Sequence, residues 1–166
     1  MTVGTEASDP REFRNALGKF ATGVTVVTAL DSSGQPRGIT ANSFSSVSLD
    51  PMLVLWSVDR SASSYDVFST AERFAINVLT EEQRVLSQQF AATEHNPFDG
   101  IACSPGRDGI PILADCAAVF ECATEHRYDG GDHVILVGRV TAFTYRDGTQ
   151  PLIYHGGEYA RLSNNS

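Results

Sequence analysis

The chain has 166 residues, 42% of them hydrophobic and 19% charged, which predicts a single globular domain over 1–166 with flexible termini at 1–8 and 161–166. Its formal net charge is −8, and Lys19 is its single lysine. This balance argues against nucleic acid or an anionic membrane as a partner. No apolar run reaches the roughly 20 residues of a membrane-spanning helix, and no secretory signal is visible at the N-terminus. We therefore expect a cytoplasmic protein.

The predicted elements begin with a helix, because Asp9 followed by Pro10 is a typical helix start and apolar residues at helical spacing continue to about Phe20. Further helices are expected at 65–70 and from 80 to about 90. Strands are predicted at 22–30, 38–49, 52–58, 74–79, 117–124 and 133–145, with an irregular segment at 91–111. The strand at 52–58 is expected to be buried on both faces. Because strands and helices do not alternate regularly, we predict a mainly β protein, a mostly antiparallel β-barrel with peripheral helices.

Standard catalytic and metal-binding motifs are missing from the sequence. It contains no G-x-G-x-x-G, no P-loop, no G-x-S-x-G and no H-E-x-x-H. Cys103, Cys116 and Cys122 include no C-x-x-C pair, so we expect free thiols and neither a disulfide framework nor a zinc site. The histidines show no metal-ligand spacing either, and no metal is expected.

The first candidate binding surface is the polar stretch 40–48, TANSFSSVS. Small hydroxyl and amide side chains occupy both faces of this predicted strand. Burying such groups is costly unless each finds a hydrogen-bond partner, and a planar ligand such as an isoalloxazine ring could supply those partners. A solvated, serine-rich edge strand explains the same residues equally well.

Three further segments are weaker candidates. Residues 57–64, SVDRSASS, join a strand to a helix, and a helix N-terminus with Arg60 and serine hydroxyls can bind phosphate. An ordinary serine cap beside a surface arginine is the commoner explanation of such a turn. The turn 130–133 places Asp132 beside His133, and the segment 154–159 places two tyrosines around a glycine pair. Ordinary turns account for both segments as well.

Taken in order, these segments resemble the flavin reductase-like family, the small NAD(P)H:flavin oxidoreductases of two-component monooxygenases that exchange diffusible flavin. The match runs from about Phe13 to Tyr159. The motifs are modest individually, but their order and spacing together are specific. The matching segments are GITANSFSSVSLDP (38–51), MLVLWSVDRSASSYDVF (52–68), FAINVL (74–79), GDHVILVGRV (131–140) and PLIYHGGEY (151–159).

The resemblance implies a flavin-binding split β-barrel that works as a homodimer and reduces FMN or FAD with NADH or NADPH. It implies direct hydride transfer to flavin N5 and delivery of reduced flavin to a separate flavin-dependent monooxygenase. Arg60 and Ser61 would anchor the flavin phosphate, and His133 would position the nicotinamide. Phe98 would cover one of the rings. The implied cofactor-binding residues are Thr40, Ala41, Asn42, Ser43, Ser46, Val47, Ser48, Ser57, Val58, Asp59, Arg60, Ser61, Ser63, Phe98, His133, Tyr154, Gly157 and Tyr159.

Two other functions stay open on the sequence. Related split barrels hold FMN tightly and act on other small molecules, and a non-enzymatic flavin- or haem-binding dimer is the third alternative. Arg60 is compatible with both FMN and FAD, so the residues favour neither flavin. They favour neither NADH nor NADPH, because the sequence shows no acid–base pair near a ribose site.

Overall fold

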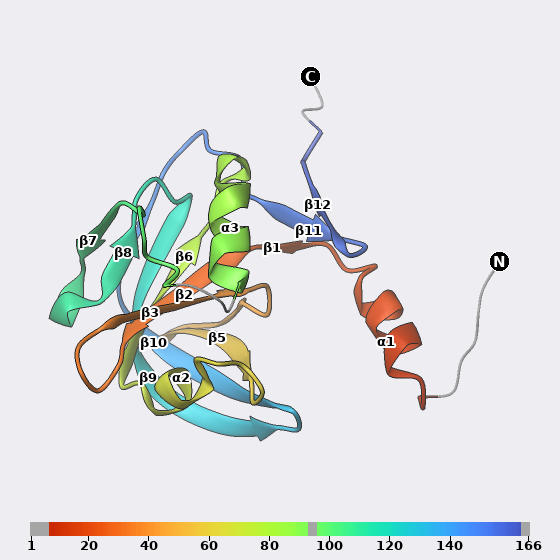
Figure 1. Cartoon of the computed structure of the whole chain (residues 1–166), viewed down its shortest axis with the longest axis horizontal. Helices are drawn as coiled ribbons and strands as arrows, with labels where there is room; N and C mark the ends of the chain where they lie inside the picture. Colours follow the sequence, from red (N-terminus) through yellow and green to blue (C-terminus); the bar gives the residue numbers. More distant parts are fainter. Residues whose placement is uncertain (1–6, 93–95, 164–166) are drawn as a thin grey trace.

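A computed structural model describes residues 7–92 and 96–163 (Figure 1). The termini expected to be flexible, 1–8 and 161–166, lie mostly outside these described residues. The helices of the described chain are short, which confirms a mainly β protein with few helices. They are α1 (Pro10–Leu17), α2 (Tyr65–Thr70) and α3 (Arg84–Ala91), with 3-10 turns η1 (Glu81–Gln83) and η2 (Arg107–Gly109). None of the described helices combines the length and apolar character needed to cross a membrane.

A seven-stranded sheet forms most of the fold, in the order β3-β2-β6-β9-β10-β5-β4. Its strands are β2 (Thr25–Leu30), β3 (Pro36–Ala41), β4 (Ser45–Leu49), β5 (Met52–Asp59), β6 (Arg73–Val78), β9 (Ala118–Gly130) and β10 (His133–Tyr145). Every pairing within it is antiparallel. The hydrogen-bonded order of the described strands runs from β3 to β4 without closing on itself, so the closed form of the expected barrel is not seen.

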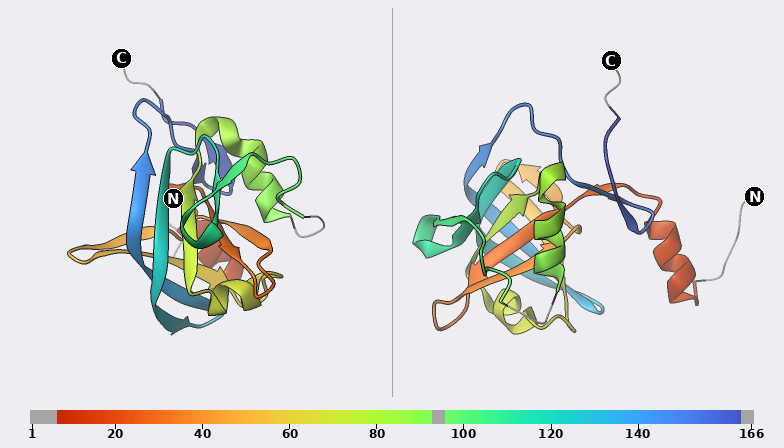
Figure 2. Two further views of the ribbon diagram at one scale, coloured as in Figure 1. Left: turned by 90° about the vertical axis from the view of Figure 1, so that its left-hand side faces the viewer. Right: turned by 45° about the horizontal axis from the view of Figure 1, so that its top comes forward.

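Two small sheets flank the large one. The first joins β1 (Thr22–Gly23) to the C-terminal hairpin β11 (Ile153–His155) and β12 (Glu158–Ala160), and the second pairs β7 (Cys103–Pro105) with β8 (Pro111–Leu113). Figures 1 and 2 show α1 standing apart from the seven-stranded sheet, beside the β11–β12 hairpin. The amide of Gly156 in that hairpin donates to the carbonyl of Gly18, just after α1, at 2.8 Å.

The prediction of a single strand at 38–49 is wrong, because the structure divides this segment into β3 and β4 at opposite edges of the sheet. The chain leaves β3 after Ala41 and turns through 42–44 before β4 begins. The Ser43 hydroxyl accepts from the Ser57 amide at 2.9 Å and lies 3.1 Å from its carbonyl, which binds this turn to β5. The side-chain alternation continues through the turn, so it does not mark the break.

Strand β5 is buried on one face and not on both, contrary to the prediction for 52–58. Its buried side chains are Val54, Trp56 and Val58, and the residues between them are only half-buried. The Trp56 ring packs edge-on against Phe68 and Phe74, with centroids 5.2 and 6.1 Å apart. This aromatic cluster fills the core between α2 and the sheet.

Two of the three cysteines are buried in the core. Burial raises the pKa of Cys116 to about 11 and that of Cys122 to about 12, so both thiols stay protonated at neutral pH. Cys103 lies exposed on β7. We expect a thiol-alkylating reagent to modify Cys103 in the native protein and all three cysteines after denaturation, as counted by mass spectrometry. Rapid labelling of Cys122 in the native protein would contradict the assigned core.

Candidate functional site

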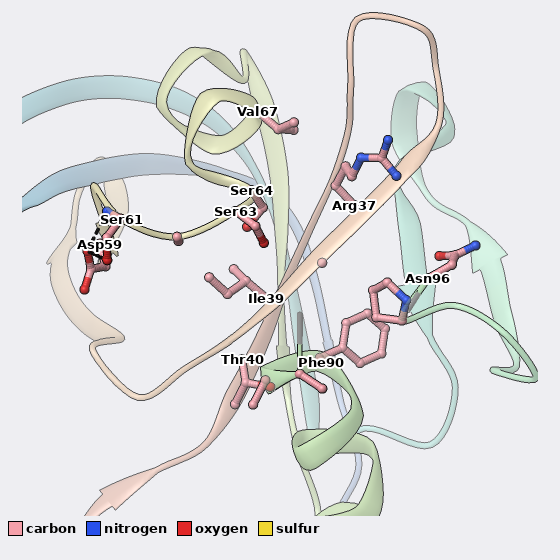
Figure 3. A pocket seen from close by; sticks show the side chains of 15 residues that line it. Arg37, Ile39, Thr40, Asp59, Ser61, Ser63, Ser64, Val67, Phe90 and Asn96 are labelled. Carbon is pink, nitrogen blue, oxygen red and sulfur yellow. Dashed lines mark hydrogen bonds between the residues drawn. The ribbon is translucent and has the colours of Figure 1, made fainter. Parts of the chain in front are cut away.

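A cavity of about 680 Å³ lies between β3, the loop after β5 and the C-terminal end of α3 (Figure 3). We call it the serine cavity. Its size falls in the range of roughly 300–1,000 Å³ typical of small-molecule sites. It is lined by residues 37–40, 59, 61–64, 67, 90–92, 96 and 97. The predicted residues that reach it are Thr40, Asp59, Ser61 and Ser63.

The loop 59–64 is folded by its own side chains. The Asp59 carboxylate accepts from both the amide and the hydroxyl of Ser61, each at 2.7 Å. The hydrogen bond from the Ser61 hydroxyl, and to a lesser extent that from its amide, lowers the pKa of Asp59. The Asp59 carboxylate is therefore ionised at neutral pH. With Ser61 occupied in this way, Ser63 and Ser64 are the hydroxyls that the loop presents to the cavity.

Arg60, in the same loop, points to the β9–β10 hairpin. Its guanidinium donates to the Gly131 carbonyl at 3.0 Å, to the Tyr65 hydroxyl at 3.0 Å and to the Asp129 carboxylate. Its amide donates to the Asp132 carbonyl at 2.9 Å. Arg60 is not among the residues that line the serine cavity. The phosphate-binding role of Arg60 therefore stays a prediction, while its observed role is to join the loop to the hairpin.

His133 is the first residue of β10 and stands opposite Asp59 of β5 in the sheet register. Its Nδ1 lies 2.7 Å from the Asp132 carboxylate, and its side chain is half-buried. The charge of His133 also contributes to the lowered pKa of Asp59. The structure thus brings His133, predicted to position the nicotinamide, to the end of β5, where the loop 59–64 begins.

A second, smaller cavity of about 270 Å³ lies beside the β11–β12 hairpin, and we call it the tyrosine cavity. It brings together the predicted residues Thr40, Ala41, Asn42, Tyr154 and Tyr159, with Val24, Ser87 and Ala91. Thr40 lines both cavities and donates to the Ser87 carbonyl at 2.6 Å.

The two tyrosines are held by hydrogen bonds to the chain. The Tyr159 hydroxyl lies 2.8 Å from the Ser87 hydroxyl, and Tyr154 donates to the Gly157 carbonyl at 3.0 Å. Gly157 has φ +87°, a conformation that favours glycine, and this permits the tight turn between the tyrosines. The tyrosine rings pack edge-on with centroids 5.6 Å apart. The segment 154–159 is therefore an ordered wall of the tyrosine cavity.

Other predicted residues lie away from both cavities. Ser46, Val47 and Ser48 belong to β4, at the sheet edge opposite β3. The Val58 side chain is buried in the core, so only its backbone is available to a ligand. The Ser43 hydroxyl is engaged by the Ser57 backbone. Phe98 packs edge-on against Phe90, with centroids 5.0 Å apart, behind the wall of the serine cavity.

The sequence analysis missed several lining residues, of which Arg37 is the most distinctive. Ile39, Val67 and Phe90 form apolar parts of the lining, and Asn96 adds an amide to it (Figure 3). Arg37 lies three residues before the polar stretch 40–48 and directly before the strand predicted at 38–49, and this position was the available signal. Apolar surface combined with a few hydroxyl, amide and guanidinium donors suits an aromatic ring that carries phosphate. The donor set of the serine cavity therefore fits a flavin nucleotide.

Comparison with known proteins assigns the family. Residues 17–163 match the model of the flavin reductase like domain. An FMN reductase (NADH) of Agrobacterium fabrum is 48% identical over 153 residues, with 92% of this chain and 86% of that protein covered. The reductase component of a flavin-dependent trigonelline monooxygenase of Acinetobacter baylyi is 44% identical over 149 residues, with coverage of 90% and 48%.

Solved structures agree with this assignment. The NADH:FAD oxidoreductase SgcE6 of Streptomyces globisporus, in complex with NAD and FAD fragments, superimposes with a TM-score of 0.93 at 36% identity, covering 99% of both chains. The chain spans about half the length of some curated relatives, 49% and 48% for two of them. With the family model matched over most of its length, this chain belongs to the flavin reductase-like family.

Proposed function

We propose that the chain catalyses the reduction of FMN or FAD by NADH or NADPH and supplies the reduced flavin to a separate flavin-dependent monooxygenase. The observation that carries this proposal is the convergence of β3, the 59–64 loop and the end of α3 on the serine cavity, in a chain of the flavin reductase-like family. His133 does not line this cavity but pairs in the sheet register with Asp59, which does. A cytoplasmic location, expected from the sequence, remains part of the proposal.

The chain's own residues would bind and align the two reactants. When bound, flavin would supply a hydride acceptor at N5 for C4 of the reduced nicotinamide, so that the nicotinamide would be oxidised as the flavin is reduced. Strand β3 and the turn after it offer backbone N–H and C=O groups to the ring at 40–43. Contact of the ring with 46–48, which lie on β4 away from both cavities, stays a prediction from the family resemblance. Ser63 and Ser64 would hold the ribityl phosphate, because the amides of Ser57, Arg60 and Ser61 already donate to other groups of the protein. No side chain has to move a proton in this step, which explains why no acid–base motif stands out.

His133 would position the nicotinamide. Its Nδ1 contact with Asp132 orients the ring and leaves Nε2 free to contact the nicotinamide nucleotide. Tyr154, Gly157 and Tyr159 would close the nucleotide site from the C-terminal hairpin. The neighbouring tyrosine cavity supports this assignment because the hairpin and strand β3 form it together.

The direct test is oxidation of NADH and NADPH, followed by the loss of their absorbance, with FMN, FAD and riboflavin each added to the purified protein. We expect turnover that depends on added flavin and a nearly colourless protein after dialysis. A yellow protein that turns over without added flavin would instead favour a tightly bound prosthetic group. Lack of turnover with any flavin would contradict the proposed activity.

We further propose that the chain forms a split β-barrel homodimer. The apolar residues of α1 and the turn after it are uncovered in one chain, with Phe13, Leu17 and Phe20 exposed by 65, 58 and 78%. An eight-residue helix is marginal in water by itself, so α1 needs a partner surface. The β4–β5 hairpin exposes Leu49 and Met52 as well. A second copy of the chain that covers these residues would explain why apolar side chains are exposed in the single chain.

Replacing Leu17 with aspartate should shift this homodimer towards monomer, because the change places a charge in the apolar face of α1. Sedimentation velocity at equal protein concentrations measures the shift. Val85→Asp is the matched control, because Val85 is also exposed by 71% but lies on α3. A wild-type protein that sediments as a monomer, or an L17D variant that sediments like wild type, would contradict the proposed interface.

A further inference from the structure

Arg37 gives the serine cavity its positive charge. Among the described residues that line this cavity, Arg37 is the cation and Asp59 the acid. The Asp59 carboxylate is turned to its own loop, where Ser61 donates to it twice. In Figure 3 the Arg37 guanidinium lies across the cavity from Asp59, with Ser63 and Ser64 between them. An anionic group among these serines would therefore meet Arg37.

The Arg37 side chain is held in place by the turn between β2 and β3. Its guanidinium lies 2.8 Å from the Asp31 carboxylate, whose side chain is only 14% exposed. Asp31 also accepts from the amides of Ser33 and Gln35, each at 2.9 Å, and is thereby fixed. The Arg37 side chain remains 43% exposed. A second guanidinium nitrogen of Arg37 donates to the Pro36 carbonyl at 3.4 Å. Arg37 is thus preorganised by Asp31 and its own strand, while further N–H groups of its five stay available to a ligand.

Arg60, the arginine that the sequence suggested for phosphate, is differently placed. Its guanidinium is engaged by the Gly131 carbonyl, the Tyr65 hydroxyl and Asp129. To bind phosphate it would have to give up contacts that join its loop to the β9–β10 hairpin. Arg37 already lines the cavity and needs no such exchange.

We infer that Arg37 is the cation that recognises a phosphoryl group of the flavin nucleotide in the serine cavity, either the phosphate of FMN or the diphosphate of FAD. A guanidinium forms charge-assisted, often bidentate hydrogen bonds with phosphate. Ser63, Ser64 and the Asn96 amide, which line the same cavity, would supply neutral donors. This inference rests on the proposed flavin site and assigns within it the residue that separates flavin nucleotides from riboflavin.

The test is the affinity of Arg37→Gln for riboflavin, FMN and FAD, measured by titration of flavin fluorescence. We expect riboflavin to bind as it does to wild type. Loss of one charge-assisted contact at a half-exposed site should weaken binding of a flavin nucleotide about tenfold. An equal loss for FMN and FAD assigns the contact to the phosphate they share, and a loss confined to FAD assigns it to the second phosphoryl group. Arg37→Lys should recover part of the affinity.

Arg73→Gln is the matched control, because Arg73 is also a half-exposed arginine, paired with Asp108 at 2.7 Å and outside both cavities. Unchanged affinity of Arg37→Gln for FMN and FAD would overturn the inference. So would an equal loss of riboflavin affinity, since riboflavin carries no phosphate. If wild-type protein binds none of the three flavins, the proposed function itself fails, which is a different result.

Discussion

Replacement of Asn77 by leucine is expected to lower the free energy of unfolding by about 2–5 kcal/mol, because it removes the hydrogen-bond partner of three buried polar groups in β2 and β8. Asn77 lies in β6 with its side chain fully buried. Its amide nitrogen donates to the Val26 carbonyl at 3.0 Å and the Thr28 hydroxyl at 3.1 Å, and its oxygen accepts from the Leu113 amide at 3.0 Å. A leucine can replace none of these bonds.

Chemical denaturation of both proteins measures this loss directly. Gln88→Leu is the control, because Gln88 is exposed on α3 and its replacement should change stability by less than about 0.5 kcal/mol. An Asn77→Leu protein as stable as wild type would show that these hydrogen bonds contribute nothing net. Since Leu113 lies in β8, the network also joins the segment after 96 to the large sheet.

Replacement of His133 by alanine is expected to raise the KM for NADH or NADPH about tenfold or more and to leave flavin affinity nearly unchanged. The proposed role of His133 is to contact the nicotinamide nucleotide, and loss of one such hydrogen bond costs roughly 1–3 kcal/mol. Its side chain lies at the start of β10, opposite Asp59, and not among the residues that line the serine cavity. Steady-state kinetics at saturating flavin, together with flavin titration, separate the two effects.

His126→Ala provides the matched control for this prediction. His126 lies on the neighbouring strand of the same hairpin, exposed and stacked against Tyr128 with ring centroids 5.5 Å apart. Its replacement should leave both the KM for the nicotinamide and the flavin affinity as in wild type. Equal losses of nicotinamide and flavin affinity in His133→Ala would instead assign His133 a general structural role.

Much of the local structure and the family could be predicted from the sequence. The Asp9–Pro10 helix start is confirmed, with the Asp9 carboxylate accepting from the Arg11 amide at 2.9 Å. The helix predicted at 65–70 coincides with α2, and the segments that carried the family resemblance lie within the region matched by the family model. These features depend on residues close together in the chain, where caps, turns and side-chain alternation act locally.

Tertiary structure alone decided how the site is built. The segment 38–49, predicted as one strand, carries no local signal for the turn at 42–44, because that turn is bound through Ser43 to Ser57 on another strand. Arg60 is directed away from the serine cavity by Gly131 and Asp129, which lie 71 and 69 residues further along the chain. Arg37 enters the cavity only because β3 packs beside the loop after β5 and the end of α3. Local composition determines which residues can bind a ligand, but contacts between distant segments determine which of them face the same cavity.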